Sequence, residues 1–182
     1  MKRSNLWILI LMIAGVGLVS SEFQPKSIIV NPYTLTKEQT IKAAAPSVRV
    51  YLAAKAVSQD SPISFDEFIK CAREETGFKD LFQSNYTHLQ ISRAEAQGSW
   101  QVRVCAARDV WGDSIANMSD KQVKYKLLTD IEWNAETAMR YAKKMYKMYN
   151  GRKSEAFAAY NRGPANVHDK SDVNRYARNI TD

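Results

Sequence analysis

Residues 72–78, Ala-Arg-Glu-Glu-Thr-Gly-Phe, decide how the chain is interpreted, because they predict a helix end that carries a buried acid. Upstream, apolar residues recur at the three-and-four spacing of one helical face: Phe65, Phe68, Ile69 and Ala72. Three residues further along this face lies Glu75, whereas Glu74 falls about 100° around the helix, toward solvent. Gly77 is a typical helix stop.

The start of this helix is also predicted, because Ser64 followed by Glu67 forms a capping-box pattern. Apolar surroundings and the negative end of the helix dipole both disfavour a carboxylate, so they should raise the pKa of Glu75. A general acid needs a raised pKa to keep its proton near neutral pH. The alternative interpretation makes Glu75 a surface residue or an ion-pair partner of Arg73 or Lys79.

The N-terminus has the pattern of a secretory signal. Residues 1–5 are basic and polar, residues 6–19 are apolar or glycine, and small residues follow. The apolar run is shorter than the roughly 20 residues of a comfortable membrane-spanning helix. Residues 1–21 are therefore predicted to be a signal peptide, with an uncleaved signal anchor as the alternative. Both place the rest of the chain in the periplasm or cell envelope, with membrane contact only through residues 6–19 if the signal is kept.

The remainder is predicted to be a linker, residues 22–36, and one compact domain, residues 37–182. The linker contains two prolines and has no sustained periodicity. The domain is expected to be mainly α-helical, since 3.6-residue periodicity recurs and strand-like alternation is rare. Besides the helix that ends near Glu75, we expect helical segments at 36–58 (broken or started by Pro46), 102–110, 131–149 and 154–161, and a loop at 79–91.

Net charge and residue types exclude some functions. The net charge of +7 suits an anionic cell-wall polymer or a membrane surface. Nucleic-acid binding is not expected, because no recognition module accompanies the basic residues. No His, Cys or Asp spacing suggests a metal site, and His88 and His168 are isolated. Cys71 and Cys105 are expected either to form one disulfide or to remain two buried thiols.

Two further segments carry groups that suit a sugar ligand. In residues 92–102, Gly98 would let the backbone approach a ligand closely, and Trp100 and Gln101 offer a stacking face and a two-way hydrogen bonder. Residues 159–167, Ala-Tyr-Asn-Arg-Gly-Pro-Ala-Asn-Val, combine a tyrosine hydroxyl, an amide and a Gly-Pro turn. The first segment alone is equally compatible with an ordinary turn, and Trp100 with a tryptophan of the core.

The order of these motifs resembles the catalytic domain of the soluble lytic transglycosylases, a lysozyme-like family that acts on peptidoglycan. The matching blocks follow the family's order: Glu75-Thr76-Gly77-Phe78, Ser92 to Val102, Asn134 with Ala138 and Tyr141, Ala159 to Pro164, and the late Tyr176. The resemblance covers about residues 60–180, and Tyr-Asn-x-Gly-Pro is its most specific part. It implies a lysozyme-like α-helical domain with a substrate cleft.

The chain departs from the family pattern in four places: Thr76 stands for the usual Ser, Ser99-Trp100 for two apolar residues, Glu95 for a common glycine, and the stretch from Glu75 to Ser92 is longer than usual. The longer stretch predicts an inserted loop over the cleft. These departures concern substrate preference more than the chemistry.

The resemblance implies that Glu75 alone performs both proton transfers, without a cofactor or metal. The bond between N-acetylmuramic acid and N-acetylglucosamine would be cleaved, leaving 1,6-anhydromuramoyl ends. The implied substrate-binding residues are Ser92, Gln101, Tyr160, Asn161 and Tyr176. Of these, Tyr160 is also expected to help hold Glu75, and Tyr176 to hydrogen-bond near the acid. A Glu95 that faced Glu75 across the cleft would instead position water.

Two alternatives remain open from the sequence. One is a goose-type lysozyme-like hydrolase on the same fold. The other is a non-catalytic peptidoglycan-binding component of an envelope-spanning or phage machine. The expected partners are peptidoglycan glycan strands, and the expected setting is local opening of the wall for a secretion, conjugation or phage apparatus.

Overall fold

The computed structural model describes Thr36 and residues 44–78, 80–82 and 85–182. The predicted signal or anchor segment, and all of the predicted linker but Thr36, lie outside the described residues. The described part is mainly helical, which confirms the predicted fold class. Its α-helices are α2 (Pro46–Ser58), α3 (Phe65–Thr76), α4 (Val104–Trp111), α5 (Asp120–Thr129), α6 (Ile131–Met148), α7 (Lys153–Arg162) and α8 (Arg175–Thr181). Short 3-10 turns are η1 (Gly112–Ile115), η2 (Pro164–Asn166) and η3 (Lys170–Asp172).

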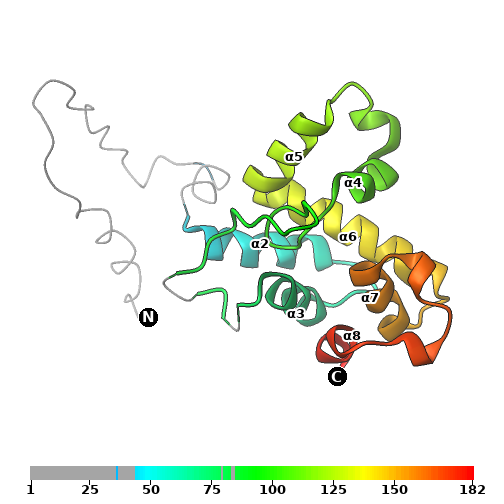
Figure 1. Cartoon of the computed structure of the whole chain (residues 1–182). Helices are drawn as coiled ribbons and strands as arrows, with labels where there is room; N and C mark the ends of the chain where they lie inside the picture. The colour runs from blue at the N-terminus through cyan, green and yellow to red at the C-terminus, as the bar shows by residue number, and fades with distance from the viewer. Residues whose placement is uncertain (1–35, 37–43, 79, 83–84) are drawn as a thin grey trace, which may run out of the picture. The chain divides into compact units, whose positions relative to one another are not determined.

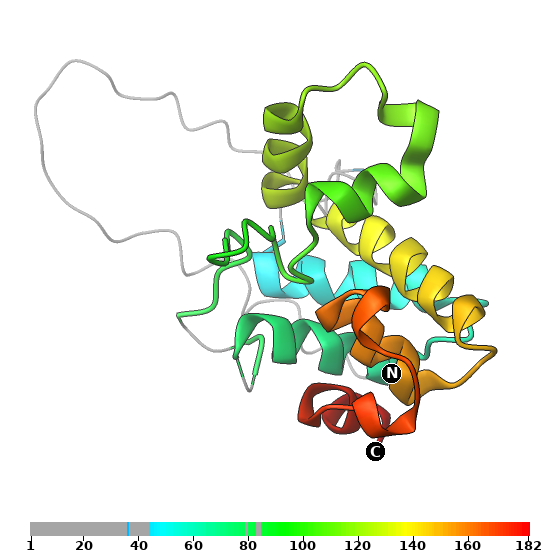
Figure 2. The same ribbon diagram turned by 45° about the vertical axis from the view of Figure 1, so that its right-hand side comes forward.

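Helix α6 is the central element of the core. It packs against α2, α4, α5 and α7, and these helices surround it in both ribbon views (Figures 1 and 2). Its inner face is buried along its whole length: Ile131, Ala135, Ala138, Met139, Ala142 and Met145. This apolar stripe matches the predicted helix at 131–149, and burial of such a stripe is the main stabilising contribution.

Helix α3 forms as the sequence predicts. The Ser64 hydroxyl accepts a hydrogen bond from the Glu67 N–H at 3.2 Å, and the Glu67 carboxylate accepts one from the Ser64 N–H at 2.8 Å. At the other end, Gly77 adopts a left-handed conformation with φ of 70°. The helix buries Phe68, Cys71 and Ala72, and it packs against α2 and α8.

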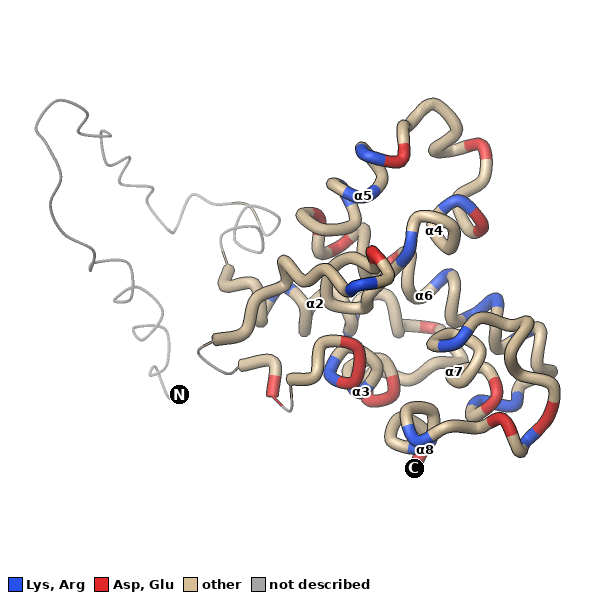
Figure 3. The backbone as a smooth tube through the Cα atoms, in the orientation of Figure 1, with Lys and Arg blue, Asp and Glu red and all other residues tan. Residues whose placement is uncertain are grey.

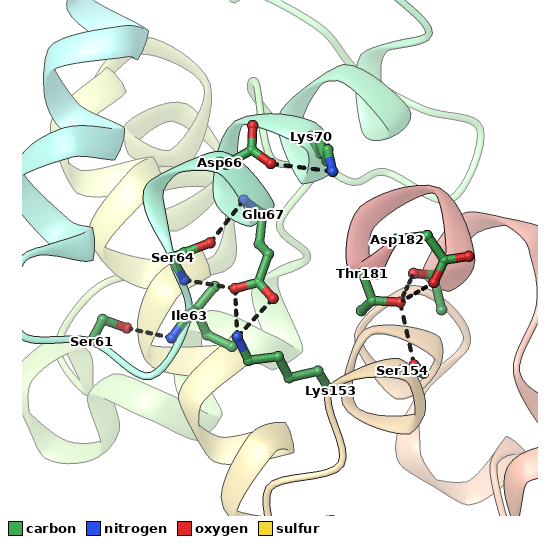
Figure 4. A network of polar contacts seen from close by, with 11 residues as sticks. Ser61, Ile63, Ser64, Asp66, Glu67, Lys70, Lys153, Ser154, Thr181 and Asp182 are labelled. Atoms are coloured by element: carbon green, nitrogen blue, oxygen red, sulfur yellow. Dashed lines mark hydrogen bonds and ion pairs between the residues drawn. The ribbon is translucent and has the colours of Figure 1, made fainter.

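A second polar contact fixes the start of α3. Lys153, the first residue of α7, donates to both carboxylate oxygens of Glu67, at 2.7 and 2.9 Å (Figure 4). The Glu67 side chain is only 11% exposed. The cation and the backbone N–H compensate the carboxylate for the water it loses on burial. The pair therefore orients α3 relative to α7.

The sequence predictions differ from the structure in some element details. Pro46 starts α2, as one of the two predicted options had it. Helix α5 was not predicted, although Ser119 and Gln122 form a capping box at its start. Ser154 does not cap α7; its hydroxyl lies 3.3 Å from that of Thr181, in α8 (Figure 4).

Basic and acidic residues are interspersed over the described helices (Figure 3). Several form surface ion pairs, such as Arg108 with Asp120 and Arg140 with Glu136. Within the described part of the chain, no helix is both long and apolar enough to cross a membrane.

Candidate active site

Glu75 lies in the last turn of α3 and lines a cavity of about 460 Å³. Burial raises the pKa of its carboxyl to about 7, from an ordinary value of 4.5, and the neighbouring Glu74 adds to the rise. Hydrogen bonds from Tyr176 and Asn161 stabilise the ionised form and act in the opposite direction. The carboxyl is therefore divided between acid and carboxylate near neutral pH, as the apolar helix face predicted.

The two hydrogen bonds to Glu75 are oriented by a single asparagine. Asn174 donates its side-chain N–H to the carbonyl oxygen of Asn161 at 3.2 Å, which leaves the Asn161 amide nitrogen to face Glu75. The other side-chain atom of Asn174, its oxygen, accepts from the Ala177 N–H at 3.1 Å and caps α8. Helix α8 carries Tyr176, so Asn174 positions both partners of the acid.

The Tyr176 hydroxyl also contacts the buried Cys71 thiol, one turn before Glu75 on α3, at 3.2 Å. When Tyr176 donates to Glu75, the thiol is left to donate to the tyrosine oxygen. Burial raises the pKa values of both Cys71 and Tyr176 well above their usual range. Both groups therefore stay protonated and neutral beside the acid.

Four other predicted site residues, from the loop before α4 and from α7, line the same cavity as Glu75: Ser92, Gln101, Tyr160 and Asn161. Gln101 donates its amide N–H to the Gly98 carbonyl oxygen at 2.8 Å, which holds the amide so that its carbonyl oxygen has no partner among the described residues. Ser92 accepts from the Ala96 N–H at 3.1 Å and keeps its hydroxyl proton for a ligand. Tyr176 lines a neighbouring cavity and reaches the site through its bond to Glu75.

Of the two interpretations of Trp100, a stacking face for sugar is wrong and a core tryptophan is confirmed. Trp100 is completely buried, stacks on Phe68 with ring centroids 4.8 Å apart, and donates its indole N–H to the Phe68 carbonyl oxygen. Its own carbonyl oxygen accepts from the Tyr160 hydroxyl at 2.8 Å. Tyr160 therefore lines the cavity with its ring, but its hydroxyl proton goes to Trp100 and not to Glu75.

Gly98 is required by a close contact with Asn134, on α6. Its φ is 76°, and a Cβ at this position would lie 2.8 Å from the Asn134 carboxamide. That carboxamide donates to the Gln97 carbonyl oxygen at 3.0 Å and accepts from the Trp100 N–H at 3.2 Å. The glycine therefore allows the close contact between this loop and α6, and it is not among the residues that line the Glu75 cavity.

Glu95 does not face Glu75 across the cleft. It is exposed, has φ of 58°, and pairs with Lys124, on α5, at 2.7 Å. Glu75 is the only acidic residue among the described residues that line its cavity. No second carboxylate among the described residues therefore lines the cavity with Glu75, where it could position water.

The predicted loop at 79–91 is only partly described. Tyr86 packs edge-on against Phe78, and its hydroxyl lies 2.7 Å from that of Ser99. The Thr76 hydroxyl donates to the Ala72 carbonyl oxygen within α3 at 2.7 Å, so the Ser-to-Thr departure concerns the helix end.

Sequence reasoning gave no binding role to four residues that also line the cavity: Arg103, Cys105, Tyr141 and Arg162. Tyr141 belonged to the third motif block, which was the available signal. Both cysteines are free, so the predicted disulfide is wrong. The alternative of two buried thiols is right for Cys71 and wrong for Cys105, which is exposed. Within the described residues, no three His, Cys, Asp or Glu side chains gather as metal ligands.

Comparison with known proteins identifies the family. The model of the transglycosylase SLT domain matches residues 53–181. The chain belongs to this family. The matched part of this SLT domain contains α3, the Glu75 cavity and every predicted site residue.

Among solved structures, this SLT domain is similar to the 70 kDa soluble lytic transglycosylase SLT70 from Escherichia coli. The TM-score is 0.53 at 19% identity, and the match covers 70% of this chain and 22% of SLT70. The SLT domain chain therefore spans about a fifth of the length of that protein. At this identity the likeness shows the fold, and it agrees with the lysozyme-like helical domain expected from the motifs.

Proposed function

We propose that this protein is a peptidoglycan lytic transglycosylase, with Glu75 as its single acid and base. The observation that carries the proposal is the state of Glu75: a carboxyl with a pKa of about 7, alone as an acid among the described residues lining its cavity. Such a group has a substantial acid fraction at neutral pH, and its conjugate base is strong enough to accept a proton in a second step.

In the first step, protonated Glu75 donates its proton to the glycosidic oxygen between N-acetylmuramic acid and N-acetylglucosamine. The bond from the muramoyl C1 to that oxygen breaks, and the N-acetylglucosamine leaves with a hydroxyl. In the second step, the Glu75 carboxylate takes the proton of the muramoyl C6 hydroxyl, whose oxygen attacks C1. The product carries a 1,6-anhydro ring, no water is consumed, and Glu75 ends protonated.

The side chains around Glu75 suit these two steps. Tyr176 and Asn161 donate hydrogen bonds that stabilise the carboxylate between the proton transfers. We propose that the Gln101 carbonyl oxygen accepts from an acetamido N–H of the sugar and that the Ser92 hydroxyl donates to the muramoyl unit; in support, both residues line the cavity, and their other polar atoms are already hydrogen-bonded. Arg103 and Arg162 add positive charge to the cavity lining.

The goose-type hydrolase alternative needs a group that positions water. No second carboxylate shares the cavity among the described residues, since Glu95 pairs with Lys124 outside it, and this favours attack by the sugar's own hydroxyl. The non-catalytic alternative fits poorly with an acid whose pKa is raised to about 7, because binding alone does not require one.

For the setting, we propose action in the periplasm or cell envelope. The support is the signal pattern of residues 1–21 and the glycan substrate that the family implies. We propose that the protein opens the wall locally for a secretion, conjugation or phage apparatus. Sequencing the N-terminus of the exported protein determines whether the signal is cleaved or retained.

The test is digestion of purified peptidoglycan by the full chain, with the released products weighed by mass spectrometry. Anhydromuramoyl ends are the expected result. Reducing ends, each heavier by one water, would show that water attacks C1 and would favour the hydrolase. Absence of release by a folded protein would contradict the enzyme and favour a binding role.

A further inference from the structure

A second cavity, of about 610 Å³, adjoins the proposed active site and has a different chemical character. It lies between the last turns of α3 and helix α8, which pack against each other (Figures 1 and 2). Tyr176 lines this cavity and hydrogen-bonds to Glu75. A ligand in it therefore lies one side chain away from the proposed acid.

The lining of this cavity is predominantly positive. Lys70 and Arg73 come from α3 and Arg175 from α8, against one acid, Glu74. Both helices carry basic positions in the charge-coloured trace (Figure 3). The Glu74 carboxylate accepts a hydrogen bond from the Asn179 amide at 3.0 Å, and it forms no ion pair with a basic residue among the described residues.

The two arginines, Arg73 and Arg175, have no ion-pair partner among the described residues. Arg108 and Arg140, in contrast, each pair with an acid. Lys70 pairs only with Asp66, whose side chain is 75% exposed, and such an exposed pair is weak and easily exchanged. Like charges gathered in a concave surface repel one another and attract an anion.

The proposed substrate carries anions near the bond that is cleaved. Each muramoyl unit bears a lactyl group from which a short peptide with free carboxylates extends. An extended peptide advances about 3.5 Å per residue, so its carboxylates lie within one or two residues' reach of a glycan strand bound beside Glu75. Guanidinium groups bind carboxylates through two parallel hydrogen bonds, and the Phe78 ring offers an apolar wall for the peptide.

We propose that this cavity is a binding site for the carboxylates of the peptidoglycan stem peptide, with Arg73 and Arg175 as the main ligands. The site rests on the proposed function for its substrate. It would make the protein prefer glycan strands that still carry their peptides over strands from which the peptides have been removed.

The test measures binding separately from cleavage. The full chain with Glu75→Gln is titrated calorimetrically with a muramoyl tetrasaccharide that carries stem peptides, and with the same tetrasaccharide after an amidase has removed them. The test variant adds Arg73→Gln and Arg175→Gln. The matched control adds Lys143→Gln and Lys147→Gln, two exposed lysines of α6 that remove the same charge.

We expect the peptide-bearing fragment to bind more tightly, and the arginine pair of substitutions to weaken it by roughly three- to tenfold, the range for two exposed charge contacts. Binding of the peptide-free fragment should stay unchanged, and the lysine control should keep the preference. The variant should melt at the temperature of its parent, since neither arginine has an ion-pair partner among the described residues.

Equal preference in the arginine variant and its parent would overturn the site, as would failure of the parent to bind the peptide-bearing fragment. Loss of binding to anionic phospholipid vesicles, with the peptide preference intact, would assign the cavity to a lipid surface instead. Failure of the proposed function is distinguishable, because it appears as absent cleavage by the chain with Glu75 intact while the binding comparison still reports on the cavity.

Discussion

Glu67 and Glu75 lie about two turns apart on the same helix, yet their environments give them opposite acidities. Burial alone would raise the pKa of Glu67, but hydrogen bonds from Lys153 and Ser64 outweigh it and lower the pKa below 4.5. At Glu75, burial dominates and raises the pKa to about 7, because its partners are neutral. The helix therefore starts with a permanent anion that fixes its position and ends with a carboxyl that can exchange its proton.

Burial alone does not decide whether a carboxylate of α3 is structural or able to exchange its proton, because the charge of its hydrogen-bond donors differs between Glu67 and Glu75. A cation and a backbone N–H make Glu67 a structural anchor (Figure 4). A tyrosine and an amide leave Glu75 near neutrality, where proton transfer in either direction is easy.

The largest effect is expected from removing the acid at Glu75, which should abolish proton transfer. Glu75→Gln should lower the rate of product release from peptidoglycan by at least about a hundredfold, the usual contribution of a positioned general acid. Glu95→Gln is the matched control, since it makes the same substitution at an exposed glutamate that does not line the Glu75 cavity. The rates are measured by chromatography of released fragments. A comparable loss in both variants would contradict a specific role for Glu75.

The next effect concerns stability as a function of pH. Between pH 4.5 and about 7, the unfolded chain has an ionised Glu75 while the folded protein keeps it protonated, so this group lowers the stability as pH rises and adds no further change above 7. Glu75→Gln should therefore stabilise the protein at pH 8, by up to about 3 kcal/mol at 1.4 kcal/mol per pKa unit, and have little effect at pH 4.

This prediction is checked by urea unfolding of the wild-type protein and the variant at both pH values. Equal stability differences at pH 4 and pH 8 would show that the carboxyl of Glu75 has an ordinary pKa.

A smaller effect is expected from removing the ion pair between Lys153 and Glu67. Lys153→Met should destabilise the protein by about 1–2 kcal/mol at pH 7, less than the cost of breaking a fully buried pair, because the Lys153 side chain is 37% exposed and partly screened by water. The lowered pKa of Glu67 means that its stabilising contribution is present above pH 4.5 and is lost as pH falls through its folded pKa.

The difference between Lys153→Met and wild type should therefore shrink in acid, as followed by chemical unfolding at pH 7 and pH 3. Lys147→Met, at an exposed position on α6, is the control and should change little. A loss that stays constant down to pH 3 would exclude the ion pair as its cause.

The smallest effect is expected from a substitution at Asn174, which changes the pKa of Glu75 without replacing Glu75 itself. Asn174→Asp keeps the oxygen that caps α8 but replaces the N–H that orients Asn161. The Asn161 amide should then turn its nitrogen away from Glu75, and the added negative charge should act in the same direction, so the pKa of Glu75 rises further. The alkaline limb of the pH–rate profile should move to higher pH.

Asn174→Ala separates this effect from helix capping. It removes the cap as well and should cost about 1 kcal/mol of stability, whereas Asn174→Asp should keep the melting temperature. An unmoved alkaline limb in Asn174→Asp would show that Asn174 acts only as a cap.

Much of α3 could be predicted from the sequence because its signals are local. Ser64, Glu67 and Gly77 specify the ends, and the apolar spacing specifies the face on which Glu75 lies. The fold class followed from the same periodicity. The cavity-lining positions of Ser92, Gln101, Tyr160 and Asn161 agree with the resemblance, while their roles toward substrate stay predictions.

What could not be predicted depends on contacts between distant segments. Trp100 has an aromatic face that suits either a sugar or a core, and only the position of Phe68 decides for the core. The two hydrogen bonds of Asn174 join it to residues of α7 and α8, and a lone asparagine in a loop gives no sign of this. The partner of Glu95, Lys124, lies on α5, a helix that the periodicity did not reveal.

The opposite acidities of Glu75 and Glu67 are measured by a ¹³C NMR titration of the glutamate side-chain carboxyls in the full chain, with Glu75→Gln and Glu67→Gln used to assign the two signals. We expect the Glu75 carboxyl to titrate near pH 7 and the Glu67 carboxyl below pH 4.5. A Glu75 carboxyl that titrates near pH 4.5 would mean that it is ionised at neutral pH, and that result would contradict its role as the proton donor.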